Sequence, residues 1–194
     1  MSDSQIKTAT LAEADRCYAV LALAFGRDPA IRWMFSHPWQ YAQIFPLFAQ
    51  AFGGEAFQHN TATYVDPFKA VALWLPPSTQ PDEQALGSLI QQAVDPENQT
   101  AVFSILEQLG EYHPQAPHWH LAIIGTDPVH QGQGCGSALL THTLALCDQQ
   151  QTPVYLEATN ARNVSLYQTQ GFEVLGTVQA GTSPTLYPML RHPQ

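Results

Sequence analysis

The pattern of apolar positions divides the chain into helical and extended segments. Steps of three and four residues between apolar positions indicate helices, whereas short β-branched and aromatic runs between turn residues indicate strands. The predicted helices cover residues 11–25, 31–58 (one or two), 82–110 (two, broken near Asp95-Pro96), 134–149 and 161–170. The predicted strands cover residues 5–8, 61–65, 70–75, 118–125, 153–158, 172–178 and 185–190.

Local signals support several of these boundaries. Thr10 followed by Glu13 is a capping pair for the first helix, and Asp28-Pro29 is expected to end that helix. Gly171 is expected to close the helix over 161–170. The order of elements is mixed, with one clear strand–helix–strand unit at 118–158, so we expect an α/β (α+β) layer architecture.

Composition narrows the class of protein. The 194 residues suit a single domain, 1–194, and 45% hydrophobic residues are enough for a packed core. Only seven residues are Lys or Arg and the formal net charge is -9, so we expect no nucleic-acid partner and no anionic membrane surface as a partner. The N-terminus lacks a signal-peptide pattern, and no apolar run approaches the ~18 residues of a membrane span, so we expect a cytoplasmic protein.

Candidate metal and disulfide chemistry is sparse. Cys17, Cys135 and Cys147 are widely spaced and include no Cys-x-x-Cys pair, so neither a disulfide framework nor a zinc site is expected. His118-x-His120 offers two potential ligands, but no third is apparent, and we expect no bound metal.

The sharpest local motif is a glycine-rich turn, Gln131-Gly-Gln-Gly-Cys-Gly-Ser137, between a predicted strand and an amphipathic helix. Glycines at alternate positions let the backbone approach a ligand closely, and amides at a helix N-terminus suit a phosphate or pyrophosphate. The spacing also approaches a dinucleotide-binding fingerprint, with Glu157 about 20 residues downstream. That reading requires more parallel strands than the rest of the chain offers, so an NAD(P)-dependent oxidoreductase is the less favoured alternative.

A second motif runs from Asn160 through Leu166-Tyr167 to Gly171-Phe172. Together the two motifs resemble the signature of the GNAT superfamily of N-acetyltransferases, with Val164 in place of the usual alanine. The resemblance is strong over 118–191 and looser over 5–75. In its details the sequence is similar to the branch of the superfamily that contains puromycin N-acetyltransferase. Residues 82–115 lie outside these motifs and are expected to be a helical insertion.

The resemblance implies a fold and a donor substrate. The fold would be a mixed, mostly antiparallel central sheet with helices on both faces and two strands, 118–127 and 153–159, that part to admit the pantetheine arm of acetyl-CoA. The backbone of Ile124, Gly125 and Thr126 would pair with that arm. The residues expected to bind the rest of acetyl-CoA are Gln131, Gly132, Gln133, Gly134, Cys135, Gly136, Ser137, Asn160, Asn163 and Tyr167.

Catalytic candidates follow from the same resemblance and from the chemistry of acyl transfer. Tyr167 matches the family tyrosine that protonates the leaving thiolate, and its phenol, with a pKa of ~10, stays protonated at neutral pH. His120 and Glu157 are candidates for the base that deprotonates the amine. Strand alternation predicts that His118, His120 and Ala122 share one face of their strand and that Trp119, Leu121 and Ile123 share the other. The choice between His120, Glu157 and a water chain stays open at this point.

The expected reaction is therefore acetyl transfer from acetyl-CoA to a primary amine of a small molecule or peptide, by direct attack in a ternary complex. The alternative within the same fold is a non-catalytic acyl-CoA sensor. The aromatic stretch 31–58 would wall the acceptor side, with Phe25, Trp33 and Tyr41 as possible lining residues. The negative net charge favours a cationic amine as acceptor. Both a monomer and a homodimer are compatible with the sequence.

Overall fold

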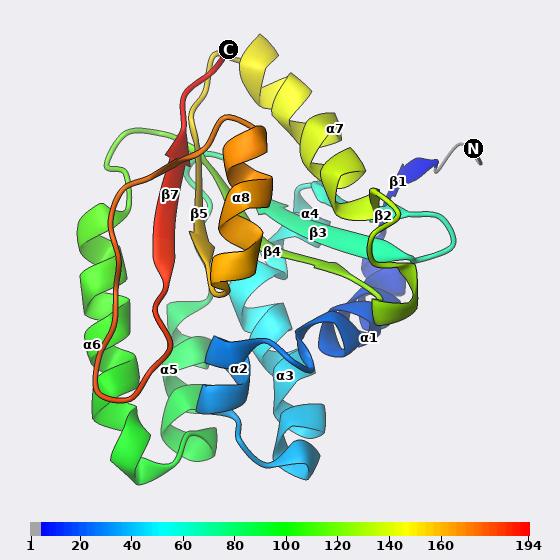
Figure 1. Ribbon diagram of the computed structural model, residues 1–194. Helices are drawn as coiled ribbons and strands as arrows, with labels where there is room; N and C mark the ends of the chain where they lie inside the picture. The colour runs from blue at the N-terminus through cyan, green and yellow to red at the C-terminus, as the bar shows by residue number, and fades with distance from the viewer. Residues whose placement is uncertain (1–4) are drawn as a thin grey trace.

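The computed structural model describes residues 5–194, which form one seven-stranded sheet with helices on both faces (Figure 1). The strand order is β1-β2-β3-β4-β5-β7-β6, and all neighbours run antiparallel except the parallel pair β4 and β5. The predicted mixed, mostly antiparallel sheet is confirmed. The strands are β1 (Ile6–Thr8), β2 (Ala62–Val65), β3 (Ala70–Leu75), β4 (Trp119–Thr126), β5 (Val154–Ala158), β6 (Glu173–Val174) and β7 (Tyr187–Arg191).

The helices follow the predicted segments closely. They are α1 (Ala14–Phe25), α2 (Pro29–Met34), α3 (Pro38–Gly53), α4 (Glu55–Gln58), α5 (Glu83–Ala93), α6 (Pro96–Tyr112), α7 (Cys135–Gln149) and α8 (Ala161–Thr169). Short 3-10 turns lie at Leu11–Glu13 and Pro128–His130. The expected capping pair is present, because the Glu13 carboxylate accepts hydrogen bonds from the backbone N–H and the hydroxyl of Thr10, each at 2.9 Å.

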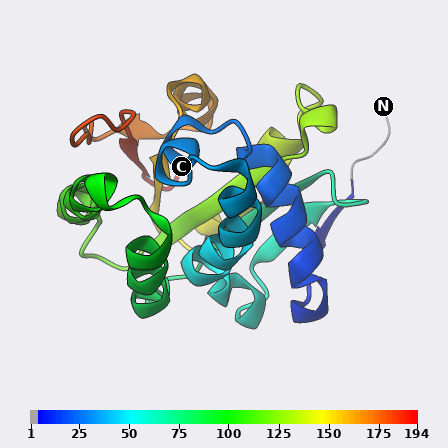
Figure 2. The ribbon, with the colours of Figure 1, turned by 90° about the horizontal axis from the view of Figure 1, so that it is seen from below.

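Two hydrophobic layers hold the sheet between the helices. On one face, α1 and α3 pack against β2 and β3 through residues such as Leu21, Phe45 and Leu73. On this side α1, α3, α5 and α6 follow one another in a row (Figure 2). On the other face, α7 and α8 cover β3, β4 and β5, with Leu140 and Leu156 in the second layer. Most of the buried apolar area, and hence most of the stabilisation, lies in these two layers.

A β-bulge in β4 changes the direction of its side chains. Leu73 pairs with Ile123 but Trp74 pairs with Leu121, so Ala122 is an extra residue in β4. Trp119 and Leu121 face α7, as predicted, whereas Ile123 belongs to the opposite layer beside α1. The prediction that Ile123 shares their face is wrong, because simple alternation does not survive the extra residue.

The central parallel strands separate soon after they meet. Within the described residues, β4 pairs with β5 only at Trp119–Val154 and His120–Tyr155, although β4 continues to Thr126. Of the remaining six residues of β4, five pair with β3 alone, and Ala122 is the bulge residue. The splayed strand pair expected at 118–127 and 153–159 is therefore present, and the cleft between the strands is lined by His120 and Ile124 of β4 and by Leu156 and Glu157 of β5.

One local prediction differs from the structure, and another is confirmed with an added role. Residues 172–178 form a strand only at Glu173–Val174, because the chain leaves the sheet at Gly176, which packs so closely on the Tyr112 ring that a side chain has no room there. Asp28-Pro29 does end the first helix, but it also begins α2. Asp28 caps α2 by accepting hydrogen bonds from the N–H groups of Ala30 and Ile31, both at 3.0 Å.

None of the helices within residues 5–194 is both long and apolar enough to cross a membrane.

Candidate active site

The glycine-rich turn lies between the end of β4 and the start of α7. Gly132 and Gly134 have φ angles of 73° and 82°, which favour glycine, and a Cβ atom at either position would meet no other atom of residues 5–194 within 4 Å. Gly134 precedes α7, whose first-turn N–H groups have no partner within the helix. Residues 131–134 are exposed. This turn therefore presents free amides and open space of the kind that suits a phosphate group.

The three residues of β4 that were expected to pair with the pantetheine arm, Ile124, Gly125 and Thr126, have different surroundings. Ile124 lines the large cavity described below. Gly125 packs directly on α1, since a Cβ there would lie 2.7 Å from the Ala24 Cβ, so its small size serves helix packing. The backbone carbonyl of Thr126 accepts a hydrogen bond from the Gln131 side chain at 3.3 Å. The strand end and the turn are thus linked directly.

Cys135 begins α7 and is 3% exposed within the layer formed by Leu139 and Leu140. It is a packing residue by its surroundings. Gly136 and Ser137 follow in the first turn and are partly exposed. Gln133 donates to the Val129 carbonyl at 3.3 Å, which helps to shape the turn.

His120 and Glu157 form the polar floor of the cleft. The Nε2 atom of His120 lies 2.9 Å from Oε2 of Glu157, and the two side chains are 5% and 12% exposed. Burial by itself raises the pKa of the Glu157 carboxyl, but His120, with smaller contributions from His113 and Tyr155, holds that pKa below its usual value. Within residues 5–194, the Nδ1 atom of His120 is buried and has no hydrogen-bond partner. A buried imidazole nitrogen without a partner is suited to accept a proton from a bound group.

Two further histidines adjoin this floor. The ring of His113, just after α6, lies 5.5 Å from that of His120 and 4.6 Å from that of His118. Burial, with help from the neighbouring His120, lowers the pKa values of both His113 and His118, so both side chains favour the neutral form. Sequence reasoning missed His113, because nothing in its local sequence indicates that the end of α6 meets β4.

Tyr167 lies on the other side of the same cavity. It is 7% exposed, in the layer with Phe172, and it lines the cavity together with His120 and Glu157. Burial raises the pKa of its phenol above the usual value, and the nearby Asp28 adds to the effect. The hydroxyl therefore keeps its proton throughout the ordinary pH range.

Asp28 also ties α2 to the segment after β5. The Thr159 hydroxyl donates to Asp28 Oδ2 at 2.7 Å, across 131 residues of sequence. The Asp-Pro pair after the first helix is a recognisable N-cap signal, but its long-range contact to Thr159 is not visible in the sequence. This bond brings together the segments that carry Arg27, Arg32 and Arg162.

Asn160 and Asn163 lie where the chain turns from β5 into α8. Asn160 caps α8 by accepting a hydrogen bond from the Arg162 N–H at 3.1 Å. Asn163 is exposed and lines the cavity. The nearby Glu157 carboxylate bonds to His120.

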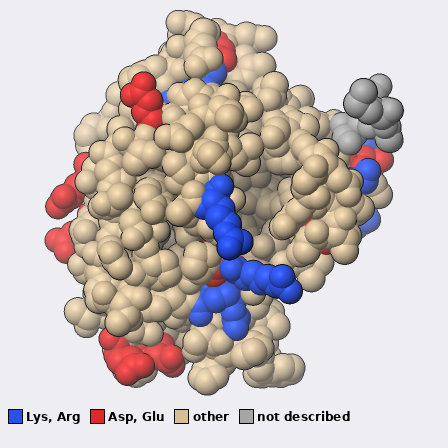
Figure 3. Space-filling view, in the orientation of Figure 1, with Lys and Arg blue, Asp and Glu red and all other residues tan. Residues whose placement is uncertain are grey.

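One cavity of about 550 Å³ connects these groups. His120, Glu157, Tyr167, Ile124 and Asn163 all line it, although they come from β4, β5 and α8. Figure 3 shows a recess on this face of the molecule, with Lys and Arg side chains gathered beside it and most acidic side chains near the periphery. An anionic ligand is therefore compatible with this face despite the net charge of -9.

The predicted aromatic lining is partly confirmed. Phe25 and Trp33 line the cavity. Tyr41 does not. It is 8% exposed, and its hydroxyl donates to the Ala22 carbonyl within the core. Among residues 5–194 there is also no group of three His, Cys, Asp or Glu side chains placed to hold a metal ion.

Comparisons with known proteins agree with this arrangement. Residues 91–174 match the acetyltransferase (GNAT) domain family. An uncharacterized N-acetyltransferase of Schizosaccharomyces pombe is 24% identical over 174 residues, covering 79% of this chain and 68% of that protein. The solved structure of the "histone acetyltransferase HPA2 and related acetyltransferase" of Corynebacterium glutamicum is 26% identical, with a TM-score of 0.70 over 98% of this chain and 96% of that one. Arylalkylamine N-acetyltransferase 2 of Aedes aegypti shares the fold at 14% identity, with a TM-score of 0.69 over 98% and 99% of the two chains.

Proposed function

Because the chain belongs to the GNAT superfamily of acetyltransferases, we propose that it moves the acetyl group of acetyl-CoA to a primary amine by direct attack in a ternary complex. The observation that carries this proposal is one cavity that joins the splayed strands to three ionisable groups suited to the reaction, His120, Glu157 and Tyr167. The similarity to the puromycin N-acetyltransferase branch stays a prediction.

The donor occupies the cleft between β4 and β5 in this proposal. The unpaired edge of β4 beyond His120 supplies backbone groups for the pantetheine amides, and residues 131–137 with the start of α7 supply amides for the pyrophosphate. Asn160 and Asn163 border the same cleft at the start of α8. The basic side chains beside the recess add a favourable field for the anionic donor.

The chemical step needs a neutral amine and a protonated leaving group. Glu157 holds the imidazole of His120 through Nε2, which leaves Nδ1 to take the proton of the incoming ammonium directly or through water. The amine nitrogen then forms its bond to the acetyl carbon as the carbon–sulfur bond breaks, and the nitrogen loses its second proton to solvent, from which the phenol that protonates the thiolate regains its own. Ordinary thiols have a pKa of about 8.5, so a proton donor assists departure of the thiolate. Tyr167, buried and protonated, is that donor.

The test is thiol release from acetyl-CoA, followed with a thiol-reactive dye, across a panel of primary amines. Calorimetry measures acetyl-CoA binding in parallel. Amine-dependent release together with saturable binding supports the proposal. Binding of acetyl-CoA without release by any amine points instead to an acyl-CoA sensor. Binding of NAD(P) in preference to acetyl-CoA in a thermal-shift screen contradicts both assignments.

A further inference from the structure

The cavity extends well beyond the polar floor. Its volume of about 550 Å³ falls within the range of about 300–1,000 Å³ typical of small-molecule sites. Tyr167, Ile124 and Leu156 line its cleft side, where the proposed donor ends. The remainder lies beneath α2, α3, α5 and α6. This remainder is the space available to an acceptor.

One wall of that space is a continuous row of aromatic rings. Phe25 stacks on Phe45 at 5.4 Å between ring centroids, Phe45 meets Phe48 at 6.2 Å, and Phe48 stacks on Phe52 at 5.7 Å. The Phe52 ring then meets the His120 ring edge-on at 5.7 Å. All five side chains line the cavity. The row therefore leads from the outer part of the cavity to the candidate base.

A second wall comes from α5 and α6, the stretch that the sequence motifs leave unassigned. Leu86 and Ile90 of α5 and Phe103 and Leu106 of α6 line the cavity. Phe103 and Leu106 are still 40% and 44% exposed. Large apolar side chains left accessible around a concavity mark a surface that an apolar ligand covers.

The charged side chains that line the cavity are acidic. Glu157 lies at the floor and Glu83 is an exposed residue of α5, and the described lining includes neither Lys nor Arg. A carboxylate on the acceptor would be buried here without a cationic partner, which is costly. Glu83 is exposed, so a second ammonium group would meet a counter-charge only at the solvent-facing part of the lining, and along the apolar walls it would lose its hydration.

From these walls and charges we infer that the acceptor is a monoamine with an aryl or bulky alkyl group and no carboxylate. Its amine lies at His120 and Glu157, and its apolar group lies between the Phe45–Phe48–Phe52 row and the α5–α6 wall. This inference rests on the proposed acetyl transfer and adds the substrate class. Helices α5 and α6 act as the specificity element.

The first experiment compares acceptors. kcat/KM is measured for phenylethylamine, for phenylalanine, which adds a carboxylate to the same skeleton, and for putrescine, a diamine. We expect phenylethylamine to exceed both by about 100-fold or more, because buried unpaired charges discriminate strongly. Equal or better use of phenylalanine or putrescine overturns the inference.

Equilibrium binding separates this inference from the proposed reaction. Calorimetry measures phenylethylamine binding to the protein saturated with CoA, whether or not turnover occurs. Binding of phenylethylamine without thiol release supports the acceptor class and contradicts acetyl transfer. Thiol release with polar amines alone supports acetyl transfer and contradicts the acceptor class. If phenylethylamine does not bind and no amine causes thiol release, both the acceptor class and the proposed reaction are overturned.

A matched pair of variants tests the α6 wall. Leu106→Asp places a charge in the lining, whereas Leu146→Asp places one on α7 at a leucine that is 40% exposed and lies outside the lining. We expect Leu106→Asp to lower kcat/KM for phenylethylamine by about 10-fold or more, with an unchanged KM for acetyl-CoA. Leu146→Asp should leave both constants unchanged. An unchanged preference for phenylethylamine over putrescine in Leu106→Asp overturns the assignment of this wall.

Discussion

The Nε2 atom of His120 lies 2.9 Å from Oε2 of Glu157, across the two central strands at the point where they part. His120 and Tyr155 make the last pairing between β4 and β5, and Glu157 comes two residues later on β5. The carboxylate therefore reaches back to the imidazole over the origin of the cleft. This hydrogen bond fixes the orientation of the imidazole ring. The other ring nitrogen, Nδ1, has no hydrogen-bond partner among residues 5–194. The two side chains therefore form one hydrogen-bonded pair.

If the pair acts as a unit, its members are not independent in catalysis. We expect Glu157→Gln and His120→Gln each to lower kcat by about 100-fold, a typical loss for general-base catalysis. The double variant should lose little more than either single variant, because the second substitution removes a function already lost. Steady-state kinetics at saturating acetyl-CoA provide the measurement. Losses that multiply in the double variant would show that the two residues act separately.

Tyr167 has a distinct role in the proposed step. Tyr167→Phe removes only the hydroxyl from a buried ring, so packing and acetyl-CoA binding should change little. We expect kcat to fall by about 100-fold with an unchanged KM for acetyl-CoA, since the proton for the thiolate is lost. Tyr187→Phe, at a partly buried tyrosine of β7 outside the cavity lining, is the matched control and should retain full turnover. Unchanged turnover in Tyr167→Phe removes Tyr167 from the acid role.

The glycine-rich turn can be tested through its backbone conformation. Gly134 has a φ of 82°, so Gly134→Ala strains the backbone by about 1–2 kcal/mol and tilts the amides of the turn. We expect weaker acetyl-CoA binding by calorimetry. Gly181→Ala is the control, because Gly181 also has a positive φ, 57°, but lies in a loop far along the chain from the turn. A similar loss of thermal stability in both variants, with weaker acetyl-CoA binding only in Gly134→Ala, supports the assignment. Equal acetyl-CoA affinity in both variants contradicts it.

The histidines next to the floor should make stability depend on pH. Burial lowers the pKa of His113 in the folded state, so the unfolded chain takes up a proton first as the pH falls. Its contribution to stability is therefore complete above pH ~6.5 and is lost as the pH decreases below that value. We expect His113→Gln to reduce the difference in Tm between pH 8 and pH 5. His142→Gln, at an exposed position on α7, serves as control and should keep the wild-type difference. The same pH dependence in wild type and His113→Gln would refute this explanation.

Much of the fold follows from the sequence because its signals are local. The apolar periodicity of residues 134–149, the cap at Thr10 and the glycine-rich turn all act over a few residues, and the elements that they predict are present. Tyr167, His120 and Glu157 were selected through motifs and strand alternation, and the fold brings all three to one cavity.

The remaining features depend on contacts between distant segments. The bulge at Ala122 is set by pairing with β3, so the sequence of β4 alone gives the wrong face for Ile123. His113 reaches the floor only because α6 ends beside β4, and Asp28 reaches Thr159 across the domain. Tyr41 resembles a pocket aromatic in the sequence, yet α1 and α3 pack around it. Patterns within a short stretch of sequence do not predict contacts between segments that lie far apart in the chain.

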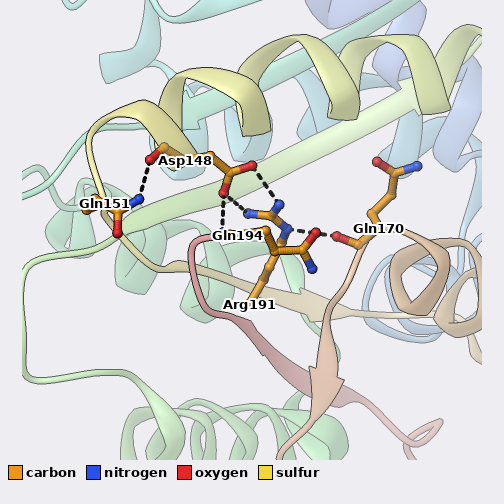
Figure 4. Close-up of polar contacts among 5 residues, drawn as sticks. All are labelled: Asp148, Gln151, Gln170, Arg191 and Gln194. Carbon is orange, nitrogen blue, oxygen red and sulfur yellow. Dashed lines mark hydrogen bonds and ion pairs between the residues drawn. The ribbon is translucent and has the colours of Figure 1, made fainter.

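A buried ion pair joins the C-terminal strand to α7. Arg191 is 4% exposed and Asp148 is 24% exposed, and two hydrogen bonds of 2.6 and 2.8 Å connect the guanidinium with the carboxylate. Figure 4 shows Arg191 also directed at the Gln170 carbonyl, to which its Nε donates at 2.7 Å. The Arg191 guanidinium holds the pKa of Asp148 below its ordinary value. The pair therefore fixes β7 against α7 and the end of α8.

Asp148→Asn leaves the buried guanidinium without its counter-charge, and we expect a loss of about 2–3 kcal/mol in the free energy of unfolding, measured by urea denaturation at pH 7. Since the folded-state pKa of Asp148 is lowered, the wild-type contribution is complete above pH ~4 and is lost as the pH falls further. Lys7→Gln is the control: it breaks the Lys7–Asp66 pair, whose side chains are 39% and 41% exposed, and should cost less than about 1 kcal/mol. A loss in Asp148→Asn no larger than in Lys7→Gln would mean that β7 is held by its ladder to β5 and by Met189 in the core, and that the ion pair contributes little.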